Sequence, residues 1–237
     1  VYRFHHSRVE LQILPQPPPK RVPVAEAARA TLTGAERNFL RRRLATPMRI
    51  QEYLDGLRYN TEADGETFRS PRRVLRDRTA NCIEGAVLAA AAFRVSGQPP
   101  LIMDLTAVHD EDHVIAVFRR GRQWGAIGTS KFTGLRFREP VYRTLRELAM
   151  SYFEHYYNLK GERTLRGYGR PVNLARFDPI SWMTSEEDLW PIAEHLERIP
   201  HVSLLTPAMA RKLGPLDARL KAAGLLHHPA AGPRKPH

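Results

Sequence analysis

Residues 81–97 constrain the fold of this chain more than any other segment. Asn81 followed three residues later by Glu84 is the pattern of a reciprocal helix N-cap, and Gly97 stands where a left-handed residue commonly ends a helix. The residues between them are nearly all small or apolar. A helix that lacks a polar face has to be buried, so the sequence predicts a central core helix over residues 82–95.

The composition is that of a globular protein. Charged residues make up 26% of the 237 residues and hydrophobic residues 42%, which excludes a wholly disordered or fibrous chain. The longest small or apolar run, residues 85–93, is less than half of what a bilayer span needs, so we expect no transmembrane helix and no membrane partner. No export signal is recognisable at the first residues, and we therefore expect a cytoplasmic protein.

The chain is strongly basic, with 37 Lys and Arg against 25 Asp and Glu and a formal net charge of +12. A surface of this charge attracts anions and is compatible with nucleic-acid binding. Most of the basic residues are arginine, however, and alanine is also abundant, a pattern that a coding bias can produce without any partner. Nucleic-acid binding therefore remains one alternative.

The sequence predicts three parts. Residues 1–24 contain a cluster of prolines that does not support a helix and indicates an extended arm. Residues 25–205 carry the periodic apolar patterns of one folded domain. Residues 206–237 predict a short helix followed by a disordered basic tail, in which His227 and His228 are expected to be solvated.

Within the central domain the patterns predict an α+β fold. Apolar residues spaced three and four apart indicate helices, and short runs rich in β-branched residues indicate strands. Besides residues 82–95, the expected helices are residues 24–44, 50–57, 141–157 and 190–199. The expected strands are residues 99–108, 113–118 and 124–127.

Cys82 is the only cysteine in the chain, so it forms no intramolecular disulfide and no four-sulfur metal site. As the first residue of the predicted core helix, it would lie at the positive end of the helix dipole, which favours the thiolate over the thiol. That position suits a nucleophile. A small buried cysteine that merely starts a core helix would give the same sequence pattern.

A nucleophilic thiol needs a base, and His113 opens the apolar strand over residues 113–118. If residues 120–121 form the turn to the next strand, His113 lies opposite Gly128. A three-residue turn would place it opposite Thr129. A histidine at a strand edge can also be purely structural, so the histidine alone does not establish a site.

Several short motifs follow one another in the order Tyr59-Asn60, Asn81-Cys82, Gly97, Asp112-His113-Val114, Gly121 and Trp124. Over residues 48–130 this order resembles the transglutaminase-like superfamily, whose core is that of papain-like cysteine hydrolases. The resemblance implies a catalytic helix packed on an antiparallel sheet, with additional flanking helices. It also implies that Cys82 is the nucleophile and His113 the base, and that no cofactor is needed.

The chain departs from the family pattern at two positions. Residue 80 is alanine where the family usually has glycine, and Gly128 stands where an aspartate would orient the histidine. A pair of Cys82 and His113 at a helix N-terminus can form an ion pair without a third member. Ser130, two residues later on the same face, or a backbone carbonyl is the alternative acceptor of the imidazole proton. Asp112 is a poor substitute because adjacent strand residues point to opposite faces, and Asp178 is a remote candidate.

A divalent metal is an alternative for one part of the chain. Acidic and histidine residues crowd a single region without a fixed ligand spacing: Asp104, His109, Asp110, Glu111, Asp112 and His113. Because the spacing matches no known ligand pattern, we expect no metal and no cofactor.

These residues lead to one main hypothesis and two alternatives. The main hypothesis is a cysteine hydrolase or acyl transferase that acts on a protein or peptide amide through Cys82 and His113. Backbone amides at the helix start would stabilise the oxyanion, and Asn81 is a second candidate for that role besides capping the helix. The first alternative is a catalytically inactive protein of the same fold that binds or scaffolds, because Gly128 replaces the acid. The second is nucleic-acid binding by the basic surface.

Overall fold

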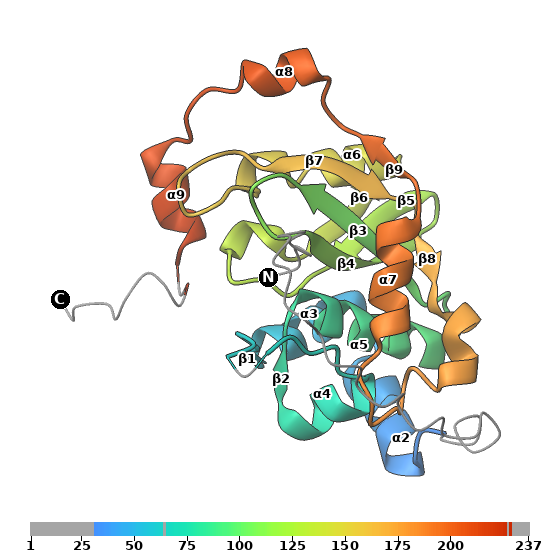
Figure 1. The fold of residues 1–237 in the computed structure, drawn as a ribbon. Helices are drawn as coiled ribbons and strands as arrows, with labels where there is room; N and C mark the ends of the chain where they lie inside the picture. The colour runs from blue at the N-terminus through green and yellow to red at the C-terminus, as the bar shows by residue number, and fades with distance from the viewer. Residues whose placement is uncertain (1–30, 64, 227, 229–237) are drawn as a thin grey trace, which may run out of the picture.

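The computed structural model describes residues 31–63, 65–226 and 228. It has an α+β fold, as the sequence predicts, with one antiparallel sheet above a layer of helices (Figure 1). The α-helices are α2 (Gly34–Arg43), α3 (Pro47–Asp55), α4 (Pro71–Asp77), α5 (Cys82–Val95), α6 (Leu145–Met150), α7 (Trp190–Arg198), α8 (Pro207–Arg211) and α9 (Ala218–Gly224). The 3₁₀ helices are η1 (Thr133–Leu135), η2 (Phe153–His155) and η3 (Leu174–Ile180). The strands are β1 (Arg58–Tyr59), β2 (Thr79–Ala80), β3 (Leu101–Ala107), β4 (His113–Arg120), β5 (Gln123–Ile127), β6 (Arg138–Tyr142), β7 (Leu165–Gly169), β8 (Val172–Asn173) and β9 (His201–Ser203).

Helix α5 has the bounds and the cap that the sequence predicts. The Asn81 side chain accepts a hydrogen bond from the Glu84 amide, and the Glu84 side chain accepts one from the Asn81 amide. Every residue from Cys82 to Phe93 is buried, and Gly97 adopts a φ of 79° just beyond the helix. The other helices of the lower layer, α2, α3 and α4, pack around α5. The helix therefore lies at the centre of the larger of two cores.

The main sheet has the strand order β6-β5-β4-β3-β7-β9, and β8 also pairs with β3. Neighbouring strands are antiparallel. Side chains of β4 alternate between the two faces: Val114, Ala116 and Phe118 join the core around α5, whereas Ile115 and Val117 join a second core. That second core contains residues of α6 and the tyrosines that follow it. Both faces of the sheet are thus covered.

The hairpin between β4 and β5 differs from the predicted register. Arg120 pairs with Gln123, so residues 121–122 form the turn instead of residues 120–121. Gly121 has a φ of 59°, which the first central residue of this tight hairpin turn requires. The expectation that His113 lies directly opposite Gly128 in the ladder was therefore wrong by two residues.

Two predicted helices are shorter than expected. Helix α2 begins at Gly34, where Thr33 caps it, so the predicted helix over residues 24–44 does not continue back through residues 31–33. Residues 24–30 and the predicted arm over residues 1–24 lie outside the described residues. The predicted helix 141–157 is also wrong in its first part, because β6 extends to Tyr142 and the Thr144 cap starts α6 only afterwards.

The chain after residue 205 contains more structure than the sequence indicates. It forms α8 and α9. His228 is buried, so the expectation that it is solvated was wrong, while His227 lies outside the described residues. Within the described part of the chain, none of the helices is long and apolar enough to span a membrane.

Candidate active site

A cavity of about 450 Å³ lies where the start of α5 meets the start of β4. Its volume is in the range of sites that hold small organic ligands. Cys82 and His113 both line it. The other lining residues are Tyr59, residues 109–112, Ser130, Lys131, Phe132, Leu135, Tyr156, residues 158–160 and His228. The structure therefore places the two predicted catalytic residues at one cavity.

Cys82 occupies the first position of α5, as predicted, but its thiol is not activated in this state. The residue is 6% exposed, and burial raises the pKa of the Cys82 thiol to about 12. The backbone amide of Val114 approaches the sulfur and lowers the pKa by a smaller amount. Burial outweighs the favourable helix start, so the thiol is protonated at neutral pH.

His113 is held by a backbone carbonyl. The residue is 4% exposed, and its Nε2 lies 2.8 Å from the carbonyl oxygen of Leu135 in η1. A carbonyl only accepts, so Nε2 carries the proton and Nδ1 keeps its lone pair. The rings of Tyr152 and Tyr156 approach the imidazole edge-on. Burial lowers the pKa of His113 to about 4, and the resting imidazole is therefore neutral.

The Leu135 carbonyl and Gly128 lie together beside the His113 imidazole. A Cβ atom added to Gly128 would lie 3.1 Å from His113 Nε2 and only 2.9 Å from the Leu135 carbonyl oxygen. Gly128 thus lies directly beside the imidazole although the two residues are not ladder partners. A larger residue at position 128 would compete with the carbonyl that already binds the ring.

The other candidates for orienting His113 bind elsewhere. Ser130 lines the cavity, but its hydroxyl accepts a hydrogen bond from the Phe132 amide at 3.0 Å. One carboxylate oxygen of Asp112 accepts the amide of Ala107. Asp178 binds Arg94, which lies in the last turn of α5 and thus at the opposite end of the helix from Cys82. The backbone carbonyl is the acceptor that the structure provides.

Asn81 is engaged as a cap. Its Oδ1 accepts from the Glu84 amide at 3.0 Å, and its Nδ2 donates to Glu62 Oε1 at 2.9 Å. The Asn81 side chain is thus engaged with Glu84 and Glu62 and does not point a donor at the cavity as an oxyanion contact would require. Tyr59, which sequence reasoning used only as part of the motif order, instead lines the cavity beside Cys82. Burial, and next the negative charge that Cys82 carries when ionised, raise the pKa of Tyr59 and keep its hydroxyl protonated as a donor.

Glu84 fixes the helix start to the preceding loop. Its carboxylate is fully buried and accepts hydrogen bonds from the Thr67 hydroxyl at 2.8 Å, the Arg69 amide at 3.0 Å and the Asn81 amide at 2.9 Å. The capping pattern predicts only the last of these contacts. Residues 67–69, which precede α4, are thereby held against the residue that precedes Cys82.

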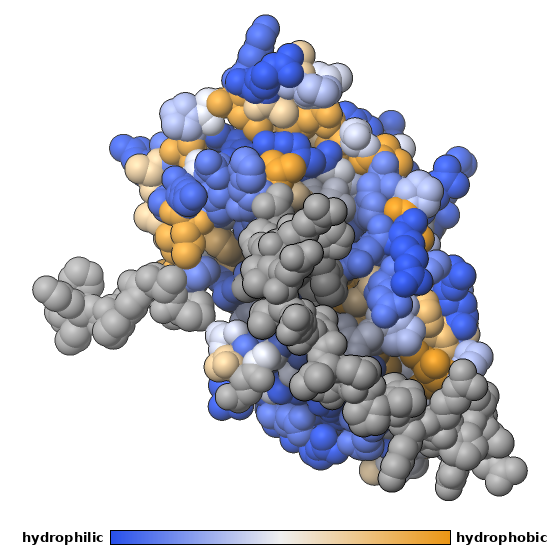
Figure 2. Space-filling model, viewed as in Figure 1, coloured by the Kyte–Doolittle hydropathy of each residue, from blue (hydrophilic) through white to orange (hydrophobic). Residues whose placement is uncertain are grey.

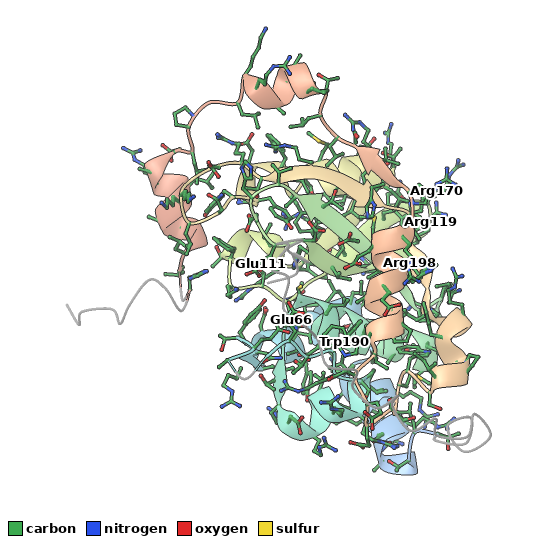
Figure 3. All side chains as sticks on the ribbon, in the orientation of Figure 1. Glu66, Glu111, Arg119, Arg170, Trp190 and Arg198 are labelled. Carbon is green, nitrogen blue, oxygen red and sulfur yellow. The ribbon has the colours of Figure 1, made fainter. Side chains whose placement is uncertain are left out.

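The acidic region does not form a metal site. Asp110 accepts a hydrogen bond from the Thr164 hydroxyl at 2.6 Å, and Glu111 lies 3.5 Å from Lys131. Among residues 31–63, 65–226 and 228, no group of three or more histidine, cysteine, aspartate or glutamate side chains is placed to hold a metal ion. Figure 3 shows Glu111 toward the left of the view, whereas Arg119 and Arg170 lie at the right.

The comparisons with known proteins add no assignment. No family model matches the chain, and no curated protein matches it either. Any assignment of function therefore depends on the residues of the cavity and on the way the fold presents them.

Proposed function

We propose that this protein is a cysteine hydrolase or acyl transferase of the transglutaminase-like, papain-like type, acting on an amide bond. The observation that carries the proposal is that Cys82 and His113 line the same cavity. Cys82 lies at the start of a buried helix, and the Leu135 carbonyl fixes Nε2 of His113. This arrangement leaves Nδ1 of His113 as the basic nitrogen. A thiol and a base at one cavity are the two groups that amide transfer through a cysteine requires.

The resting pair is neutral, so His113 acts as a general base rather than as half of a preformed ion pair. Sγ of Cys82 attacks the amide carbonyl carbon while its proton passes to Nδ1 of His113. The carbon–nitrogen bond then breaks, and the imidazolium returns the proton to the leaving amine. Water or a second amine next attacks the thioester, which regenerates the thiol.

The negative oxygen of the tetrahedral intermediate needs hydrogen-bond donors. The first amides of α5, including that of Cys82, have no partner within the helix and carry its positive dipole end. The Tyr59 hydroxyl is a further donor at the same cavity. Among the described residues, no hydrogen bond engages this hydroxyl, so it is free to bind the substrate oxygen.

The test uses Cys82 as its own reporter, since it is the only thiol. Alkylation by iodoacetamide at pH 7 should be at least about tenfold slower in His113→Gln than in the parent, because the base no longer takes up the thiol proton. Turnover of fluorogenic peptide amides, and incorporation of a fluorescent amine into casein, should both be absent in Cys82→Ala. Equal turnover in Cys82→Ala and the parent would disprove the proposal.

A catalytically inactive scaffold is the second candidate, and the burial of both groups favours it. A thiol with a pKa raised to about 12 is inert unless a base assists it. The scaffold predicts that iodoacetamide reacts slowly with the folded protein and at the same rate in the parent and in His113→Gln. The alkylation comparison therefore separates the two candidates before any substrate is known.

A further inference from the structure

The C-terminal part of the chain completes the wall of the cavity. Helix α9 lies beside η1, at the end of the sheet where the loop after β3 also lies (Figure 1). Two side chains from outside α9 donate hydrogen bonds to backbone carbonyls of α9, and one side chain of α9 donates to a backbone carbonyl outside it. These bonds are Tyr157 hydroxyl to Leu220 carbonyl at 3.1 Å, Thr133 hydroxyl to Ala223 carbonyl at 3.0 Å, and Lys221 ammonium to Leu159 carbonyl at 2.6 Å.

A glycine allows α9 to approach this closely. A Cβ atom on Gly224 would lie 1.7 Å from the Tyr157 hydroxyl oxygen, well inside the van der Waals limit. Apart from Gly224, the residues of α9 are exposed or only partly buried. The helix is therefore held by hydrogen bonds and close backbone contact rather than by an apolar face of its own.

Just beyond α9, His228 places a ring on the cavity. Its ring centroid is 4.8 Å from that of Phe132, and the Phe132 ring meets the Tyr157 ring edge-on at 5.4 Å. His228 and Phe132 both line the cavity that contains Cys82. His228, Phe132 and Tyr157 thus form a continuous row of rings, which we call the aromatic wall.

Charged groups of the lining are largely engaged within the protein. Asp110 accepts from the Thr164 hydroxyl, Asp112 accepts from the Ala107 amide, and Glu111 lies beside Lys131. What the lining presents to a ligand is then mainly ring and aliphatic surface, from Tyr59, Phe132, Leu135, Tyr156, Leu159 and His228. Figure 2 shows hydrophobic residues on the left side of the molecule, near the region that α9 occupies in Figure 1.

We infer that the cavity selects substrates whose acyl group carries a large apolar, preferably aromatic, side chain, and that His228 with Phe132 sets this preference. The volume of about 450 Å³ accommodates such a group together with the reacting carbonyl. Aromatic rings gain from edge-on contacts with other rings in addition to burial. The inference rests on the proposed function, since it assumes that the reacting carbonyl is bound next to Cys82.

The experiment compares two alkylating reagents on the full chain, iodoacetamide and N-benzyl iodoacetamide. Each rate is divided by the rate of the same reagent with glutathione, which removes the intrinsic reactivity. We expect the benzyl reagent to be favoured about tenfold or more in the parent, because its ring is buried against the aromatic wall. In His228→Ala this preference should fall at least about fivefold.

Two further variants make the result specific. Phe132→Leu keeps an apolar side chain but removes a ring, and should lower the preference in the same direction. Leu226→Ala alters an exposed residue of the same segment that does not line the cavity, and should leave it unchanged. Phe132 lies outside the C-terminal segment that carries His228. Phe132→Leu therefore tests the role of the aromatic wall even where His228→Ala detaches that segment from the cavity.

The outcomes separate this inference from the proposed function. Rapid alkylation by both reagents without a preference overturns the inference and leaves the chemistry of Cys82 standing. A preference that is the same in the parent, His228→Ala and Phe132→Leu overturns the assignment to the aromatic wall. A thiol that neither reagent modifies overturns both proposals together.

Discussion

His113 and His201 lie on the same sheet but differ in the group that accepts their hydrogen bond. His113, on β4, donates to the Leu135 carbonyl at 2.8 Å. His201, on β9, has its Nε2 3.0 Å from a carboxylate oxygen of Asp104. Burial lowers the pKa of His113 to about 4, whereas the hydrogen bond to Asp104 raises the pKa of His201.

The difference shows how the fold favours the neutral form of one imidazole and the charged form of the other. A carbonyl fixes the ring without supplying charge, so a buried histidine stays neutral and retains a lone pair. A carboxylate favours the imidazolium, which has no lone pair to offer. The cavity beside Cys82 holds the first kind of histidine, and this is the kind that can take up a thiol proton.

The largest expected effect is on acid stability through His113. Its folded pKa lies below the unfolded value of 6.5, so its contribution is present above pH 6.5 and lost as the pH falls toward 4. A fall from 6.5 to about 4 corresponds to about 3 kcal/mol in the free energy of unfolding. The parent should therefore lose about 3 kcal/mol more than His113→Gln between pH 7 and pH 4, measured by urea denaturation.

Glutamine suits this comparison because its amide can still donate to the Leu135 carbonyl but does not titrate in this range. His155→Gln is a graded comparison. Burial also lowers the pKa of His155, which is only partly buried and lies outside the cavity, so its difference should have the same sign and a smaller size. If the parent and His113→Gln lost stability in parallel over this range, the imidazole would not be held in a neutral, buried state.

The second prediction places a carboxylate beside His113. Gly128→Asp introduces an acid at the position where the resembled family carries one, but its Cβ atom would lie 2.9 Å from the Leu135 carbonyl oxygen. Crowding of this kind costs about 2 kcal/mol, so we expect the variant to be less stable by that amount in urea denaturation. We also expect no gain in the alkylation rate of Cys82, because the carbonyl already orients the ring.

Two glycine variants serve as controls for the crowding. Gly128→Ala adds the same Cβ without a charge and should lower the free energy of unfolding by a similar amount. Gly34→Ala adds a methyl group that meets nothing within 4 Å and should lose none. A Gly128→Asp protein as stable as the parent, with faster alkylation, would show that η1 moves aside and that a carboxylate can replace its carbonyl.

Local patterns predicted the part of the site that depends on neighbours in sequence. The spacing of Asn81 and Glu84 and the apolar run after them defined α5, and with it the position of Cys82. The choice of His113 came from its place at the start of an apolar strand and from the family resemblance. Both residues line the cavity, although the register between β4 and β5 was displaced by the turn at Gly121.

Other parts of the site have no signature in a single sequence. A backbone carbonyl carries no residue identity, so nothing marks Leu135 as the acceptor for His113. The lowered reactivity of Cys82 depends on burial by segments distant in the chain, which outweighs the helix dipole. His228 lies in a segment that mixes Gly, Pro, Ala and basic residues without a periodic apolar face, and its burial depends on Gly224 and on the rings that precede β7.

The smallest expected effect has the opposite pH dependence and concerns His201. Its folded pKa lies above 6.5, so its contribution is present below pH 6.5 and lost as the pH rises above the folded pKa. The side chain is 22% exposed, and solvent screening should keep the effect below about 1 kcal/mol. The difference in unfolding free energy between the parent and His201→Gln should therefore shrink from pH 6 to pH 8.5. The corresponding difference for His113→Gln should instead grow from pH 6 to about pH 7.5 and stay flat above it. A His201 difference that instead grew with pH would mean that the carboxylate of Asp104 does not hold the imidazolium, and the contrast between the two histidines would then lie in burial alone.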